Sequence, residues 1–423
     1  MKRTLTLILT LTLLLACLAP AGLAAEQVTI NFWGGWTGPD ADTMKGIVDK
    51  YMGEHPNVTI NFETQQWTPL FTKFLADAST GNAPHILAMR PMDMGQFIEM
   101  GLMDDAFATT IGIDAANYSP AAWDGTMYKG KQYAIPLDQH MHGLYYNEDM
   151  LKAAGIDNPP ATGEELIDAA RRLTIDKNGK NSTEDGFDKD NIVQYGYSFN
   201  MNHHVGFQMS AMIAQQGGTP FTNEMSEVPF DGGQAARALS FLQDLVIKYG
   251  VCPIGDKTPV ASFTAGSVAM FVDGPWQMPA LEATDLNWKS ARYPKVFDEQ
   301  IAWGNEHIFA FPLSERSDAQ SQAVRDFILW MDQNSGEWAK SGQIPASTSG
   351  QAIAAALPGR QAFIDSMANM YLLPASAKSA ELFGSSATSP FVVAAQSLLL
   401  DGNDPAAVAE QLKADMNAIL SMP

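Results

Sequence analysis

Cysteine is almost absent from this chain of 423 residues, which contains only Cys17 and Cys252. Because Cys17 lies in an N-terminal leader segment, one cysteine remains beyond it. This excludes an internal disulfide and any metal site built from several cysteines. We expect Cys252 to be a buried apolar residue rather than a nucleophile.

Positive charge is also scarce: 26 Lys and Arg stand against 47 Asp and Glu, a net charge of -21. Without Lys2 and Arg3 of the leader, 24 positive charges remain and the net charge becomes -23. Such a surface repels nucleic acid and anionic lipid headgroups, so neither is an expected partner. The acidity favours solubility and says little about a ligand.

Several signatures of enzymes are missing. The chain has no Gly-x-Ser-x-Gly elbow, no His-Glu-x-x-His and no phosphate-binding P-loop. We therefore expect no catalytic residues. An exported glycoside hydrolase stays open as an alternative, because such an enzyme needs only two carboxylates about a scissile bond and acids are abundant here.

Only the first residues form a long apolar run. Residues 1–25 have Lys2 and Arg3 before the apolar stretch 5–16, and small residues follow, which is typical of a secretory signal peptide. Residues 14–17 approximate a lipobox, which would place a lipid on Cys17. Ordinary cleavage near Ala24 or Ala25 is favoured slightly. In both cases the protein is exported, to the periplasm or the cell surface.

Strand and helix patterns then alternate. Residues 28–32, 58–62 and 86–89 have strand patterns, whereas 40–52 and 67–78 have apolar residues at helical spacing. This β-α-β-α-β order predicts an α/β fold with a mainly parallel sheet. The length predicts two domains.

The rest of the chain continues this mixture. Extended segments are expected at 135–137, 144–146, 268–272 and 308–311, and helices at 164–173, 235–246, 324–331 and from Pro405 after an Asp404 N-cap.

Several short segments occur in an order typical of one family. They are Thr80–Ile86 (with His85 where the family usually has Asp), Gly101–Met103, Leu144–Leu151, Phe263–Trp276 and Gly342–Pro345. In these the chain resembles the extracellular solute-binding proteins of ATP-driven (ABC) importers, and within them the sugar-binding group that includes the maltose-binding protein. The resemblance runs from about residue 28 to the C-terminus.

That resemblance implies a two-lobed periplasmic-binding-protein-like fold, with two mixed or mainly parallel sheets flanked by helices. Lobe one would hold 26–136 and 304–346, and lobe two 137–303 and 347–423, joined by several crossing segments. It also implies a monomer that captures a carbohydrate, with an oligosaccharide favoured, between closing lobes and delivers it to membrane permease subunits. The alternative ligand is an anionic polyol or sugar acid.

Ligands of α/β sheets bind beyond the carboxyl ends of the strands. The first such end carries Trp36 and Asp40, whose indole and carboxylate suit the C–H face and the hydroxyls of a sugar. Trp33 is expected in the core. Gln66 and Trp67 follow the second strand.

Arg90 follows the third strand, where it either binds an anion bidentately or forms an internal salt bridge. By the resemblance, Trp276 in Gly-Pro-Trp is a sugar-stacking residue. Asp138, His140 and His142, near the first crossing, are hydroxyl partners or hinge residues. Looser candidates are Asn202, His203, His204 and Trp303.

The segment 176–191 has the composition of a calcium loop, with Asp176, Asn178, Asp188 and Asp190 as candidate ligands. Its spacing differs from an EF-hand, because Phe187 occupies the twelfth position, where Glu belongs. We expect a solvated turn and no cofactor, with structural calcium as the alternative.

Overall fold

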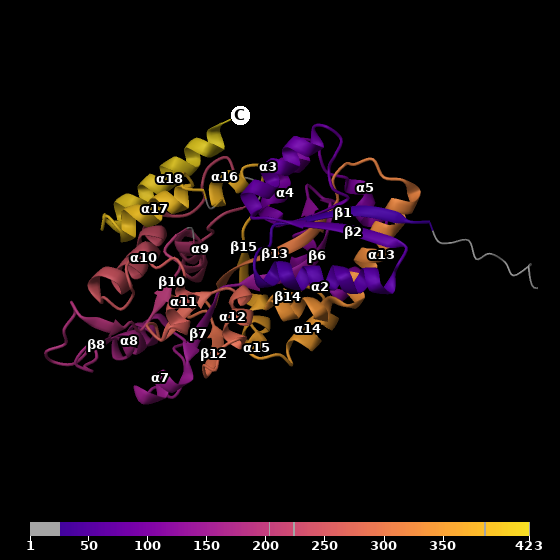
Figure 1. Cartoon of the computed structure of the whole chain (residues 1–423). Coiled ribbons are helices and arrows are strands. Elements are labelled where there is room, and N and C mark those ends of the chain that lie inside the picture. Colours follow the sequence, from indigo (N-terminus) through magenta and orange to yellow (C-terminus); the bar gives the residue numbers. More distant parts are fainter. Residues whose placement is uncertain (1–25, 203, 223–224, 385, 423) are drawn as a thin grey trace, which may run out of the picture.

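The computed structural model describes residues 26–202, 204–222, 225–384 and 386–422. The signal segment with Cys17, and the candidate His203, lie outside these ranges. Figure 1 shows two bodies, each centred on one sheet.

The larger sheet has the strand order β14-β6-β13-β3-β1-β2, with β15 paired to β13. The parallel pairs β1–β2 and β1–β3 confirm the predicted parallel start, while β13 runs antiparallel to β3 and β6. The strands are β1 Val28–Gly34, β2 Val58–Thr64, β3 Ile86–Met89, β6 Ala134–Met141, β13 Ala302–Ala310, β14 Ile344–Pro345 and β15 Met370–Leu372.

Helices cover both faces of this sheet. Helices α2 (Pro39–Glu54) and α13 (Asp318–Gln333) pack on the face that carries Ile30 and Phe32, while α3 (Trp67–Ala78) and α4 (Pro91–Glu99) pack on the face of Trp33 and Leu87. Because both faces are covered, the strands are apolar on both sides. Trp33 is in the core, as predicted.

The smaller sheet has the order β10-β11-β7-β12: Ser198–Phe199, Met270–Asp273, Gly143–Asn147 and Trp288–Arg292. Its core includes residues of α8 Gly163–Leu173, α9 His204–Gln215, α10 Gly232–Gln243, α17 Pro390–Leu399 and α18 Pro405–Ser421. The Asp404 carboxylate accepts the backbone N–H of Ala407, so the predicted cap of α18 forms.

Short elements connect these layers. They are α5 Asp105–Thr109, α6 Pro120–Asp124, β4 Met127–Tyr128, β5 Lys131–Gln132, α7 Glu148–Ala153, β8 Ile175–Asp176, β9 Ile192–Gln194, α11 Pro259–Thr264, α12 Met278–Glu282, α14 Thr348–Ala354, α15 Arg360–Ile364 and α16 Ser379–Phe383. Within the described ranges, no helix combines the length and apolarity that crossing a bilayer requires.

The chain passes between the two sheets where β6 leads into β7 and again where β12 is followed by β13. Strand β15 belongs to the larger sheet, through the pairs Ala302–Met370 to Gly304–Leu372, although it lies within the range 347–423 assigned above to lobe two. The exact lobe boundaries stay a prediction.

At one place, backbone from the two bodies meets directly. Gly342, just before β14, has a φ of 95°, and a Cβ there would overlap the carbonyl group of Pro275, just after β11. Only glycine fits this backbone conformation and this close approach.

Candidate functional site

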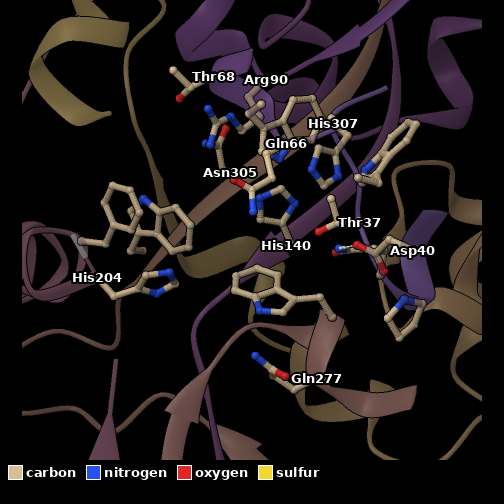
Figure 2. Close-up of a pocket in the computed structure, with 18 of the residues that line it drawn as sticks. Thr37, Asp40, Gln66, Thr68, Arg90, His140, His204, Gln277, Asn305 and His307 are labelled. Atoms are coloured by element: carbon tan, nitrogen blue, oxygen red, sulfur yellow. Dashed lines mark hydrogen bonds between the residues drawn. The ribbon is translucent and has the colours of Figure 1, made fainter. Parts of the chain in front are cut away.

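A cavity of about 580 Å³ lies between the two bodies, at the ends of β1, β3 and β11 and along β6 and β13. Figure 2 shows its side chains converging around His140 and His307. It is lined by Gly35, Trp36, Thr37, Pro39, Asp40, Gln66, Trp67, Thr68, Arg90, His140, Asn202, His204, Phe207, Trp276, Gln277, Trp303, Asn305, His307 and Gln343.

Aromatic side chains form much of this lining, and three indoles lie on glycines. A Cβ on Gly35 would overlap the ring of Trp67, and one on Gly274 would overlap the ring of Trp276. Gly34 makes the same approach to the indole of Trp36. Since each glycine lets an indole lie flat on the backbone, the strand ends fix the positions of these rings before any ligand arrives.

Further aromatic side chains form the opposite wall of the cavity. Trp303 stacks on Phe207 with centroids 4.3 Å apart and planes 2° from parallel. Trp276 meets His140 edge to face, with centroids 5.6 Å apart. A half-exposed indole such as Trp276 suits the C–H face of a sugar ring.

Beneath the cavity, the buried carboxylate of Asp138 accepts hydrogen bonds from four N–H groups. Its oxygens lie 3.0 Å from His140 Nδ1, 2.7 Å from His307 Nδ1 and 2.7 Å from Trp338 Nε1. The backbone N–H of His307 also donates to it. Burial alone would raise the pKa of Asp138, but the imidazoles of His307 and His140 outweigh burial and hold that pKa well below its usual range.

This carboxylate fixes the orientation of two imidazoles. Because a carboxylate only accepts hydrogen bonds, each Nδ1 must carry its hydrogen. Burial, with the neighbouring His307, lowers the pKa of His140 to about 4, so His140 is neutral at pH 7. Its Nε2 is therefore an acceptor available to a hydroxyl donor.

Two more buried carboxyls lie beside the cavity. Gln343 Nε2 donates to Oδ2 of Asp40, while Oδ1 of Asp40 has no partner among the described residues. Behind the wall, Asp273 accepts from the backbone N–H of Gly274 and from Gln277 Nε2, which positions the Gln277 amide. Burial raises the pKa of each carboxyl to about 7.

Arg90 is the only Lys or Arg in the lining described above, and it is already paired. Its Nε and Nη2 donate to both oxygens of Asp93, at 2.6 and 3.1 Å. Its guanidinium also lies 5.2 Å from the ring centroid of Trp67. The salt bridge expected from the sequence therefore forms, and it occupies the Nε–Nη2 edge of the guanidinium, one of the two edges that can bind an anion bidentately.

The structure gathers most of the predicted site residues around this one cavity. Trp36, Asp40, Gln66, Trp67, Arg90, His140, Trp276 and Trp303 line it, as do the looser candidates Asn202 and His204. Asp138 lies behind the lining, where its carboxylate accepts hydrogen bonds from the imidazoles of His140 and His307. His142 pairs with His204, its Nε2 2.9 Å from the other ring's Nδ1.

Sequence reasoning missed seven polar or aromatic lining residues: Thr37, Thr68, Phe207, Gln277, Asn305, His307 and Gln343. Gln277 directly follows the predicted Trp276, so its position was readable. Asn305 and His307 lie on β13, where their polarity interrupts the apolar pattern of a buried strand. That interruption was the available signal.

The residues of the calcium-loop candidate form hydrogen bonds and an ion pair within the segment 176–191. The Asp176 carboxylate accepts the backbone N–H groups of Asn178, Lys180 and Asp188, at 2.8 to 3.0 Å. Asp188 accepts from Asn191 and pairs with Lys177. Structural calcium at Asp176, Asn178, Asp188 and Asp190 stays the alternative to the expected solvated turn.

Among described residues, the one cluster of three His, Cys, Asp or Glu side chains with metal-ligand spacing is Asp138, His140 and His307. The carboxylate of Asp138 in this cluster already accepts four N–H donors, so its hydrogen-bonding capacity is used without a metal.

Comparison with solved structures identifies the fold. A substrate-binding protein of Listeria monocytogenes, solved in complex with cycloalternan, matches with a TM-score of 0.78 over 94% of this chain and 100% of its own, at 19% identity. The predicted two-lobed periplasmic-binding-protein-like fold is therefore confirmed.

Sequence relatives agree with this. A putative binding protein of Brucella abortus is 23% identical over 286 residues, which are 66% of this chain and 66% of the relative, just under two thirds of its length. The maltotriose-binding protein of Pyrococcus abyssi is 22% identical over 313 residues, 72% of this chain and 62% of the relative.

The family model described as "bacterial extracellular solute-binding protein" matches residues 46–358, about three quarters of the chain. Together with a ligand-sized cavity between two α/β lobes, this match shows that the chain belongs to the bacterial extracellular solute-binding proteins, a family of exported binding proteins rather than enzymes.

Proposed function

We propose that this protein captures a neutral carbohydrate between its two lobes and delivers it to the permease subunits of an ABC importer. The observation that carries the proposal is the cavity itself, in which indoles seated on glycines face buried hydrogen-bond acceptors. Indoles suit the C–H faces of sugar rings, and Asp40 with His140 suits hydroxyl donors. The maltotriose and cycloalternan named for two similar proteins support the same class of ligand.

The state of Arg90 supports a neutral ligand over an anionic one. An anion needs an uncommitted cation, but Arg90 is engaged by both oxygens of Asp93. Asp40 adds a further carboxyl to the same lining, which disfavours a sugar acid or a glycerol phosphate.

The experiment is a ligand screen on residues 26–423. Thermal unfolding is followed with maltose, maltotriose, mannobiose, lactose, glucuronate, glycerol phosphate and calcium chloride. A ligand present at 100 times its dissociation constant adds about 2.7 kcal/mol to the free energy of unfolding, which raises the midpoint by a few degrees. We expect such a shift with one class of neutral sugar and none with calcium.

Variants then place the ligand. Trp276→Ala should cost about 2 kcal/mol or more of binding free energy, because it removes a central aromatic contact. Trp330→Ala is the matched control, since Trp330 lies on α13 and donates to Glu54, outside the cavity lining. Equal sugar affinity in the two variants would contradict the proposed site.

Arg90→Gln separates the two ligand classes. We expect it to change the affinity for neutral sugar by less than about 1 kcal/mol, the range of contacts outside the binding hot spot. A midpoint shift with glucuronate or glycerol phosphate alone, abolished in Arg90→Gln, would overturn the neutral-sugar proposal and favour the anionic one.

A further proposal concerns export and the position of the mature N-terminus. We propose cleavage near Ala24 or Ala25, with a monomer released outside the cytoplasmic membrane. Mass spectrometry of the exported protein tests this directly, because cleavage before Cys17 would leave a lipid-modified cysteine at the N-terminus instead.

A further inference from the structure

A second cavity, of about 330 Å³, lies beside β13 and β15. Asn305 lines both this cavity and the larger one. Its other lining residues are Pro91, Ala121, Asp124, Gly125, Met127, Phe221, Thr222, Glu306, Leu372, Leu373, Pro374 and Ala375. These come from α4, α6, β4 and β13, from the segment after α9, and from β15 with the segment after it.

Glu306 is the unusual member of this lining. Its side chain is fully buried, and neither carboxyl oxygen has a partner among the described residues. It packs so closely on Gly125 that a Cβ there would overlap its carboxyl group. Gln139 lies opposite Glu306 in the strand register, and its amide nitrogen also lacks a partner in the described part of the chain. Buried polar atoms without partners are rare in native proteins and call for a ligand, ion or water.

The described part of the lining carries charge of one sign. Among the described residues, Asp124 and Glu306 are the charged members of the lining, and none of the described lining residues is Lys, Arg or His. Asp124 lies at the exposed side, while Glu306 lies at the buried side. The remaining walls are mainly apolar, from Phe221, Leu372 and Leu373 among others. An apolar chamber with carboxyls at two depths suits a positively charged ligand with an apolar body.

We propose that this second cavity binds a small organic cation, with a primary ammonium group facing the buried Glu306 carboxyl and an alkyl body against Phe221 and Leu372. A divalent metal ion fits less well, because it needs about six oxygen ligands and the lining supplies few beside its apolar side chains. A cavity of 330 Å³ also exceeds the size of a bare ion.

Protonation offers an independent readout. Burial, with the charges of Asp138 and Asp124, raises the pKa of Glu306 well above its usual range. Burial therefore favours the protonated carboxyl when no cation is bound, and an ammonium ion that pairs with the carboxylate would displace that proton. Calorimetry in two buffers of different ionisation enthalpy measures that proton release.

The experiment is calorimetric titration of the full mature chain with n-butylammonium chloride. Its neutral isostere n-butanol and sodium chloride at equal ionic strength are the control ligands. We expect butylammonium alone to bind, with release of a proton, and Glu306→Gln to weaken binding by at least about tenfold. Asp124→Asn should weaken it less. Glu99→Gln, at an exposed carboxyl that Lys129 already pairs, should bind as the wild type does.

Three results would overturn the proposal: no heat of binding with butylammonium, unchanged affinity in Glu306→Gln, or tighter binding of potassium, magnesium or calcium than of butylammonium. Because sugar binding is assayed through Trp276, failure here leaves the proposed function standing. A folded Glu306→Gln variant is confirmed by its retained response to the sugar found in the ligand screen.

Discussion

Two buried carboxyl groups on neighbouring strands differ in their hydrogen-bond donors, and their pKa values are shifted in opposite directions. Asp138 on β6 accepts four N–H donors, and its pKa lies well below the usual range. Glu306 on β13 has no donor among the described residues, and its pKa lies well above that range. Both side chains are fully buried. Burial therefore does not decide whether an acid is charged; the donors built around it do.

The largest test of this comparison is Asp138→Asn. An amide supplies one acceptor oxygen and turns its NH₂ toward groups that are themselves donors, so buried N–H groups lose their partner. We expect a loss of about 3–5 kcal/mol in the free energy of unfolding at pH 7, measured by urea denaturation.

The pH dependence has a definite sign. Because the folded pKa of Asp138 is lowered, its contribution is present above the ordinary pKa and disappears as the pH falls through the folded value. The variant should lack this acid-side loss. Asp285→Asn, at an exposed carboxylate, is the control and should stay within about 0.5 kcal/mol of the wild type. Equal losses in both variants would contradict the role of the four donors.

Trp338→Phe tests one donor alone. It removes the Nε1–H that lies 2.7 Å from Asp138 and keeps an aromatic ring in the core. A hydrogen bond to a charged group contributes about 1.5–3 kcal/mol, and we expect a loss of that size in thermal or urea unfolding.

The matched control is Trp33→Phe, a buried indole whose Nε1 has no partner in the described part of the structure. It makes the same reduction in ring size without removing a hydrogen bond. If both variants lose the same free energy of unfolding, packing rather than the bond to Asp138 explains the effect.

Glu306→Gln should act in the opposite direction, as a change in how the free energy of unfolding depends on pH rather than as a fixed loss. A raised folded pKa means that the wild type loses stability as the pH rises above about 4.3, the ordinary value for Glu. The variant escapes this loss, by up to about 1.4 kcal/mol per pH unit between pH 5 and 7.

Urea denaturation of both proteins across that interval measures the difference in slope. Asp40 and Asp273 also have raised pKa values, but both are present in either protein and cancel in the comparison. Parallel stability curves would show that Glu306 ionises normally in the fold.

The sequence predicts the regular parts of this fold well, for a physical reason. Strand β3 was expected at 86–89 and is found there, because an apolar run between breakers has one interpretation. Strand β13 was expected only from residue 308, yet it begins at Ala302. Its first part carries Asn305, Glu306 and His307, whose burial depends on partners that no local pattern contains.

The site residues that could be predicted are those whose signals lie close together in the sequence. Trp36, Trp67 and Trp276 stand at strand ends beside turn or helix-start residues, so position along the chain points to them. Asp138 was found as a candidate, but its place behind the lining depends on His307 and Trp338, 169 and 200 residues away. The paired state of Arg90 was stated as an alternative, and only the geometry shows that it forms.

The contact of Gly342 with Pro275 limits how near the two lobes come, next to Gln343 and Trp276, which line the larger cavity. Backbone meets backbone there, so the separation is set by main-chain atoms and not by a side chain that can change rotamer. Any larger residue at position 342 would push the two lobes apart and shift the population toward molecules with open lobes. Under the proposed function, solute would then be released faster.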